Sequence, residues 1–93
     1  METKHVIKLI DGNFHPKDAA RVLMQLISDK INYHNVEMLS IYEHFNGDVS
    51  HSVKRINELS EAKESLRELL ERAEQEGFDL VVESNINIKL VKA

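Results

Sequence analysis

The segment from Leu80 to Val91 alternates between aliphatic and polar residues, and this alternation constrains the fold more than any other feature of the chain. With the exception of Ser84, its even positions carry branched aliphatic side chains: Leu80, Val82, Ile86, Ile88 and Leu90. Every odd position from Glu83 to Lys89 is polar. A period of two residues is typical of a strand with one buried face. We therefore predict one continuous strand, whose apolar face another element must cover.

A shorter aliphatic run, from Val6 to Ile10, lies near the beginning of the sequence. The dipeptide Asp11–Gly12 follows it and is typical of a turn. We predict a strand from Val6 to Ile10 that ends at this turn. Ile7 and Leu9 are expected on one face, and Val6 and Ile10 on the other.

The residues from Pro16 onward predict a helix. Proline suits the first helical position, where its missing N–H leaves no hydrogen bond unmade, and Asp18 supplies a negative charge in the first turn. Apolar residues then recur at helical spacing and form a broad stripe: Ala19, Ala20, Val22, Leu23, Leu26, Ile27 and Ile31.

Residues 32–48 allow two interpretations. Asn32, His34 and Asn35 disfavour a helix. Beyond them, apolar residues recur at three-residue or helical steps: Val36, Met38, Leu39, Ile41, Tyr42 and Phe45. We favour a helix that kinks near Asn35 and ends at Asn46–Gly47. A looser, partly irregular segment is the alternative.

A second helix is predicted from Ser52 to Glu76, and Gly77 provides its C-terminal stop. Three residues can cap its start: Asp48, Ser50 and Ser52. Its apolar positions follow a three-four spacing, which Lys63 interrupts: Ile56, Leu59, Leu66, Leu70 and Ala73. This narrow, coiled-coil-like seam needs a partner of similar length, and the first helix supplies one.

These elements predict an α+β fold with the order strand, helical hairpin, strand, in a single small domain that spans residues 1–93. Since the hairpin returns the chain to its starting point, the two strands should lie side by side and antiparallel. A two-stranded sheet is only marginally stable in water, and each strand has a free edge. We therefore expect a homodimer that forms through the sheet edges, through the long second helix, or through both. Pairing of the sheet edges would give a four-stranded sheet whose apolar face the helices cover.

The composition narrows the possible functions. The chain has no cysteine, which excludes disulfides, thiolate catalysis and cysteine-based zinc sites. Its formal net charge is −4 and neither half is basic, so we do not expect a nucleic-acid partner. No segment approaches the roughly 20 apolar residues of a transmembrane helix, and Met1–His5 does not lead into a secretory signal. We expect a cytoplasmic protein without a membrane partner.

Candidate catalytic or metal-binding residues are few. Histidines and carboxylates gather around the connection between the helices: His34, His44, His51, Glu37, Glu43 and Asp48. Their spacing contains neither an HExxH motif nor a pair of histidines four residues apart. The glutamates of the second helix are interpreted as a solvated face. We predict no catalytic, metal-binding or cofactor-binding residue, and no cofactor.

A longer pattern runs through most of the chain. It consists of Ile10-Asp11-Gly12-x-Phe14, Pro16-x-Asp18-Ala19-Ala20, Leu23-x-x-Leu26-Ile27-x-x-Lys30-Ile31 and Ser84-x-Ile86-x-Ile88. In this pattern the chain resembles short uncharacterised bacterial proteins of unassigned function. The resemblance implies a bacterial origin and assigns no active site.

The function predicted from the sequence is a non-enzymatic, homodimeric assembly or protein-interaction module, with an unidentified protein as a further possible partner. Six residues are expected at the dimer surface or in the core beside it: Leu59, Leu66, Leu70, Ile86, Ile88 and Leu90. The alternative is a small nucleic-acid-binding regulator, because a strand before two helices also occurs in ribbon-helix-helix DNA-binding proteins. A small enzyme or metal protein is the third class.

Overall fold

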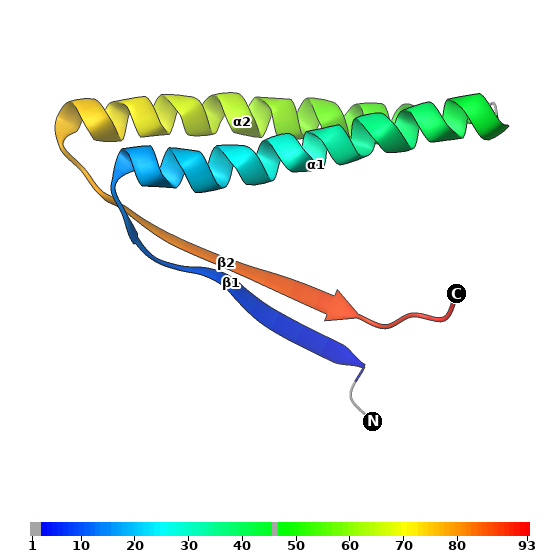
Figure 1. The fold of residues 1–93 in the computed structure, drawn as a ribbon, viewed down its shortest axis with the longest axis horizontal. Coiled ribbons are helices and arrows are strands. Elements are labelled where there is room, and N and C mark those ends of the chain that lie inside the picture. Colours follow the sequence, from blue (N-terminus) through cyan, green and yellow to red (C-terminus); the bar gives the residue numbers. More distant parts are fainter. Residues whose placement is uncertain (1–2, 46) are drawn as a thin grey trace.

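The computed structural model describes the backbone of residues 3–45 and 47–93, and the side chains of residues 3–41 and 47–93. Its elements are β1 (Lys4–Phe14), α1 (Pro16–Phe45), α2 (Ser50–Glu76) and β2 (Leu80–Lys89). The two strands form an antiparallel sheet, and the two long helices form a hairpin (Figure 1). The predicted α+β fold, with a helical hairpin between two strands, is confirmed.

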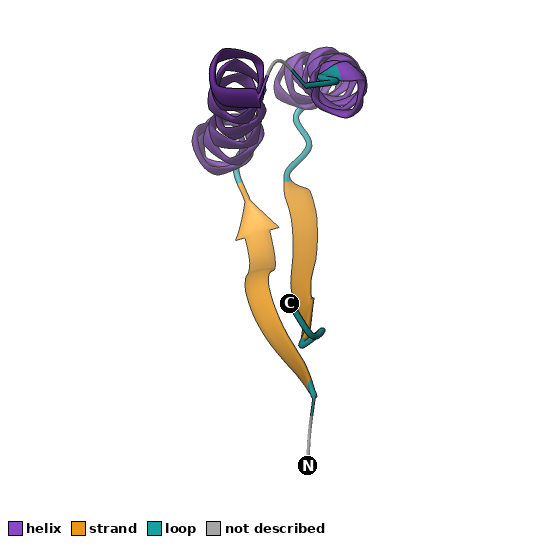
Figure 2. Ribbon diagram, turned by 90° about the vertical axis from the view of Figure 1, so that its right-hand side faces the viewer, coloured by secondary structure: helices purple, strands orange, loops and turns teal. Residues whose placement is uncertain are grey.

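The helical hairpin and the two-stranded ribbon start from a common corner and diverge (Figure 1). The corner lies where Phe14 leads into Pro16 and where Gly77 leads toward Leu80. Viewed along the helices, the two helices form one layer and the two strands hang below it (Figure 2). The molecule measures 50 × 37 × 15 Å, so it is long and thin. The ribbon therefore touches the helices near the corner and leaves them further out.

The strand β1 is longer than predicted. It runs through Asp11–Gly12 to Phe14, and Gly12 pairs with Val82 instead of turning. The local preference of this dipeptide for a turn is overridden because β2 offers a continuous partner strand. A Cβ atom at Gly12 would lie 3.4 Å from the ring of Phe14, which is an ordinary packing distance.

A one-residue irregularity interrupts the pairing of β1 with β2. Lys8 pairs with Asn85 and Ile10 pairs with Ser84, so Leu9 has no partner in the ladder. Such a bulge reverses the alternation of faces along the strand that carries it. The predicted faces of β1 are therefore wrong: Ile7 and Ile10 lie on the same side.

The strand β2 is continuous from Leu80 to Lys89, as predicted. Cross-strand partners in an antiparallel ladder point to the same face. One face, called here the inner face, carries Ile10, Phe14 and the even-numbered aliphatic residues of β2 up to Ile88, together with Ile7 and His5. The outer face carries the polar pairs Lys4–Lys89, Lys8–Asn85 and Asp11–Glu83.

The helix α1 begins at Pro16 and continues without a break through Asn35, where we predicted a kink. The uncertain segment is therefore helical up to Phe45; the predicted end at Asn46 lies outside the described residues. The side chains that point toward α2 follow a regular four-three spacing and are partly or fully buried: Ala20, Met24, Ile27, Ile31, His34, Met38 and Ile41.

The helix α2 presents the matching row of partly or fully buried residues: Ser52, Ile56, Leu59, Lys63, Leu66, Leu70 and Ala73. The two rows form the seam of the helical hairpin. Gly77 ends the helix with a left-handed φ of 78°, and the N–H of Phe78 donates to the carbonyl of Ala73 over 2.8 Å. This is the glycine stop that the sequence predicted. In the described part of the chain, neither helix combines the length and the apolar character needed to cross a membrane.

Candidate interaction surface

The core of a single chain is small. Among the residues whose side chains the structure describes, four aliphatic residues other than proline are buried: Ile10, Ala19, Leu70 and Ala73. Two of them are alanines, which remove little apolar surface from water. Most large aliphatic side chains are therefore only partly covered by their own chain.

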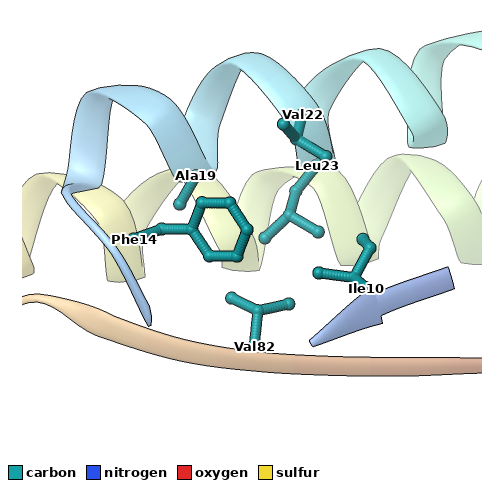
Figure 3. A pocket seen from close by; sticks show the side chains of 6 residues that line it. All are labelled: Ile10, Phe14, Ala19, Val22, Leu23 and Val82. Atoms are coloured by element: carbon teal, nitrogen blue, oxygen red, sulfur yellow. The ribbon is translucent and has the colours of Figure 1, made fainter. Parts of the chain in front are cut away.

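The first part of the core closes the corner between α1 and the ribbon (Figure 3). Side chains from β1, α1 and β2 point toward one another there: Ile10, Phe14, Ala19, Val22, Leu23 and Val82. They leave no space between them that would hold a water molecule. This packing fixes the inner face of the ribbon to α1 near the corner.

Further from the corner, the inner face of the ribbon is open. We call residues 4–8 of β1 and 85–89 of β2 the distal ribbon. The apolar side chains on its inner face remain 40% (Ile7), 39% (Ile86) and 43% (Ile88) exposed. They lie on the same inner face as Ile10 and Val82, which pack in the corner. The inner face of the ribbon is therefore covered near the corner and uncovered in the distal ribbon.

The helical hairpin has an uncovered apolar strip on the side that meets the ribbon. Val22 lines the corner, and Leu26 follows it one helical turn later on the same side of α1. On α2, Leu69 lies beside Leu80 at the start of β2. Val22, Leu26 and Leu69 are 38%, 41% and 50% exposed, and we call them the hairpin strip.

The total solvent-accessible surface of the chain is also larger than that of a compact monomer. A compact monomer of 10.7 kDa exposes about 5,500 Å². This chain exposes 7544 Å², which is roughly 2,000 Å² more. Stable protein–protein interfaces bury about 800 Å² on each partner, and permanent ones bury more. The additional surface is therefore large enough to form a permanent interface.

Charge is distributed unevenly between the ribbon and α2. No Asp or Glu occurs among residues 3–10 and 84–93, which contain Lys4, Lys8, Lys89 and Lys92. Helix α2, in contrast, contains seven glutamates against five lysines and arginines, a net charge of −2. The distal ribbon is therefore basic, and the exposed side of α2 is acidic.

Ion pairs along α2 hold part of this acidic surface in place. The Nε atom of Arg67 donates to Glu64 over 3.1 Å, and its Nη1 atom donates to Glu71 over 2.7 Å. The hydrogen bond from Arg67 lowers the pKa of the Glu64 carboxyl. All three side chains are about half exposed, so each pair contributes little to stability.

The six residues predicted at the dimer surface or in the core fall into two groups. Leu59, Leu66 and Leu70 lie on the seam, where α1 covers them. Ile86 and Ile88 lie on the open distal ribbon, and Leu90 follows β2 with 68% exposure. The structure therefore places Leu59, Leu66 and Leu70 on the seam within one chain, where they are partly or fully buried, and places Ile86, Ile88 and Leu90 on its surface.

A polar cluster interrupts the apolar seam. His34 and Glu37 were grouped from the sequence near the connection between the helices, but their burial beside Ser52 was not predicted. His34 is only 6% exposed, and neither ring nitrogen has a hydrogen-bond partner among the side chains that the structure describes. Its Nδ1 atom lies 3.4 Å from Oε1 of Glu37, which accepts a hydrogen bond of 3.0 Å from the hydroxyl of Ser52. The bond from Ser52 is the main reason why the pKa of Glu37 is lowered. The four-three spacing from Ala20 to Ile41 is the signal that places His34 on the seam.

This cluster has the residue types of a hydrolytic triad without its connections. In a triad the histidine bonds the serine and removes its proton, while the carboxylate orients the histidine. Here Ser52 donates to Glu37 instead, so the histidine is not placed to remove the proton of this hydroxyl. The side chains of His44 and Glu43 lie outside the described residues. Among those described, no group of three His, Cys, Asp or Glu residues could hold a metal ion.

Comparison of the chain with protein-family models, with curated proteins and with solved structures finds no match. The resemblance to short bacterial proteins therefore stays a prediction.

Proposed function

We propose that this protein is a cytoplasmic, non-enzymatic assembly module that works as a homodimer. Its working surface is the open inner face of the distal ribbon together with the hairpin strip. Burial of these surfaces supplies the core that one chain lacks.

The observation that carries the proposal is the additional exposed surface of roughly 2,000 Å², together with the large aliphatic side chains that stay exposed on the distal ribbon and the hairpin strip. Burial of apolar surface stabilises by about 25 cal/mol for each Å². Burial of these side chains against a partner would therefore add to a domain stability that is usually only about 5–15 kcal/mol. A second copy is always present at the same concentration, so it is the simplest partner.

The test is the mass in solution, measured by size exclusion with light scattering over a dilution series from about 100 μM to 100 nM, concentrations that bracket the micromolar-to-nanomolar affinities of most complexes. We expect twice the mass of the chain throughout the series. A mass of one chain at the highest concentration would contradict the proposal.

A second candidate function is a small nucleic-acid-binding regulator. One observation favours it: Lys4, Lys8 and Lys89 share the outer face of the ribbon with Asn85 and Asn87. A two-stranded ribbon fits the major groove of DNA, and lysine and asparagine read base edges there. Salt-sensitive binding of a labelled DNA duplex would support this candidate. If the anisotropy of the duplex does not change at low salt, this candidate is wrong.

A further inference from the structure

We propose that the distal ribbon of each copy packs on the hairpin strip of the other copy, in a reciprocal, two-fold symmetric contact. This inference rests on the proposed homodimer and deepens it, because it states which surface meets which.

The first argument is that one chain cannot bring these two surfaces together. The corner packing holds the ribbon at an angle to the helices, and the two layers diverge beyond it (Figures 1 and 3). Ile86 and Ile88 therefore stay exposed, although Leu26 and Leu69 of the same chain are exposed too. A second copy supplies the missing partner for both surfaces.

The second argument is that net charge favours the hairpin over a second ribbon as the partner surface. Contact between two distal ribbons would place two basic segments beside each other, and like charges repel even though Lys4, Lys8 and Lys89 lie on the outer faces. Contact between a ribbon and a hairpin places a basic segment beside α2, whose net charge is −2. Two-fold symmetry then repeats the same favourable contact at the other end.

The third argument is that the inner face of the distal ribbon suits burial. Its side chains are Ile7, Ile86 and Ile88, with His5 as the polar residue opposite Ile88. The polar residues Lys8, Asn85 and Asn87 lie on the outer face, where they stay in water after docking. One face of the ribbon can therefore be buried without removing a lysine or a carboxylate from solvent.

The test uses two variants, one on each surface, in the full chain. Ile88→Asp places a charge on the distal ribbon, and Leu26→Asp places one on the hairpin strip. Each should raise the dissociation constant of the dimer at least about 100-fold, because a buried, unpaired charge is strongly disfavoured. The matched controls, Asn87→Asp on the outer face and Asn32→Asp on the exposed side of α1, add the same charge and should leave the dimer unchanged.

Mixing the two variants gives the decisive result. In a reciprocal contact, the ribbon of the Leu26→Asp chain meets the hairpin of the Ile88→Asp chain, and this contact is intact. An equimolar mixture should therefore form a heterodimer, detected by mass and, if the separate variants are unfolded, by recovery of helical circular dichroism. If neither variant weakens the dimer, or if the mixture forms no heterodimer, the reciprocal contact is wrong while the proposed homodimer stands. A monomeric unmodified protein would overturn both.

Discussion

The helical hairpin and the ribbon both carry a long apolar surface, but only the hairpin buries its surface within one chain. The seam residues of α1 find their partners on α2 because a short connection returns the chain along its own length. The ribbon has no such return, so the inner face of its distal half remains open. An apolar periodicity therefore predicts that a surface is buried, but it does not show whether the same chain or a second chain covers that surface.

The largest expected effect tests the seam at two neighbouring residues. Leu70 is 6% exposed on the seam, whereas Leu69 is 50% exposed on the hairpin strip. Replacing Leu70 with alanine should cost about 2–5 kcal/mol because it leaves a cavity. We expect the urea midpoint to fall at every protein concentration. Leu69→Ala should lower the midpoint mainly at concentrations where the dimer forms. If Leu70→Ala and Leu69→Ala lowered the urea midpoint equally at every protein concentration, the distinction between the seam and the hairpin strip would be wrong.

A smaller effect, with the opposite sign, is expected at Lys63. This residue occupies a seam position, flanked one turn on either side by Leu59 and Leu66, and is partly buried. A lysine at such a position fixes the register of the helices at a cost in stability. Lys63→Leu should therefore raise the stability of the hairpin by about 1 kcal/mol, measured by thermal unfolding. A decrease would mean that the ammonium group makes a favourable contact.

The junction between hairpin and ribbon gives a third prediction. Gly77 has a φ of 78°, and a Cβ atom there would meet no other atom within 4 Å. Gly77→Ala should therefore act through backbone strain alone and cost about 1 kcal/mol. Asparagine tolerates the left-handed conformation better, so Gly77→Asn should recover part of the loss. Equal unfolding temperatures for glycine and alanine would refute the strain.

The smallest predicted effect concerns the polar cluster in the seam. The pKa of Glu37 is lowered, chiefly by the hydrogen bond from Ser52, so this carboxylate favours the folded state when it is charged. Its contribution is complete above the pKa of the unfolded chain and is lost as the pH falls through the lower pKa of the folded chain. At pH 7 the urea midpoint of the unmodified protein should exceed that of Ser52→Ala. This difference should shrink as the pH falls from 7 to 3, a range of about four units that includes the usual pKa of glutamate. A difference that is constant across this range would contradict the link.

Much of the fold could be predicted from periodicity. The two-residue alternation after Leu80 and the three-four spacing of α2 each identified an element correctly, because burial on one side imposes these periods. The faces of β1 could not be predicted, since a single unpaired residue, Leu9, reverses the alternation. The predicted turn at Asp11–Gly12 is wrong because the pairing of β1 with β2 outweighs the local preference of this dipeptide for a turn.

The candidate surface was predicted in part. Ile86 and Ile88 were predicted at the dimer surface or in the core beside it from the same pattern that identified their strand, and they are exposed in one chain. The sequence did not separate them from Leu59, Leu66 and Leu70, since an aliphatic residue looks the same in a core and at an interface. His34 was grouped with the other histidines near the connection between the helices, and its burial was not predicted because one polar residue in an apolar row resembles an interruption of the pattern.

The bulge at Leu9 also determines the direction of the ribbon. Lys8 and Ile10 pair with the adjacent residues Asn85 and Ser84, so a chain without Leu9 could pair in one unbroken register and keep every side chain on its present face. What it would lose is the local bend and twist that a bulge introduces. Leu9 therefore sets the angle between the ribbon and the helices. Its deletion would change the direction of the ribbon and leave the same side chains on each of its faces.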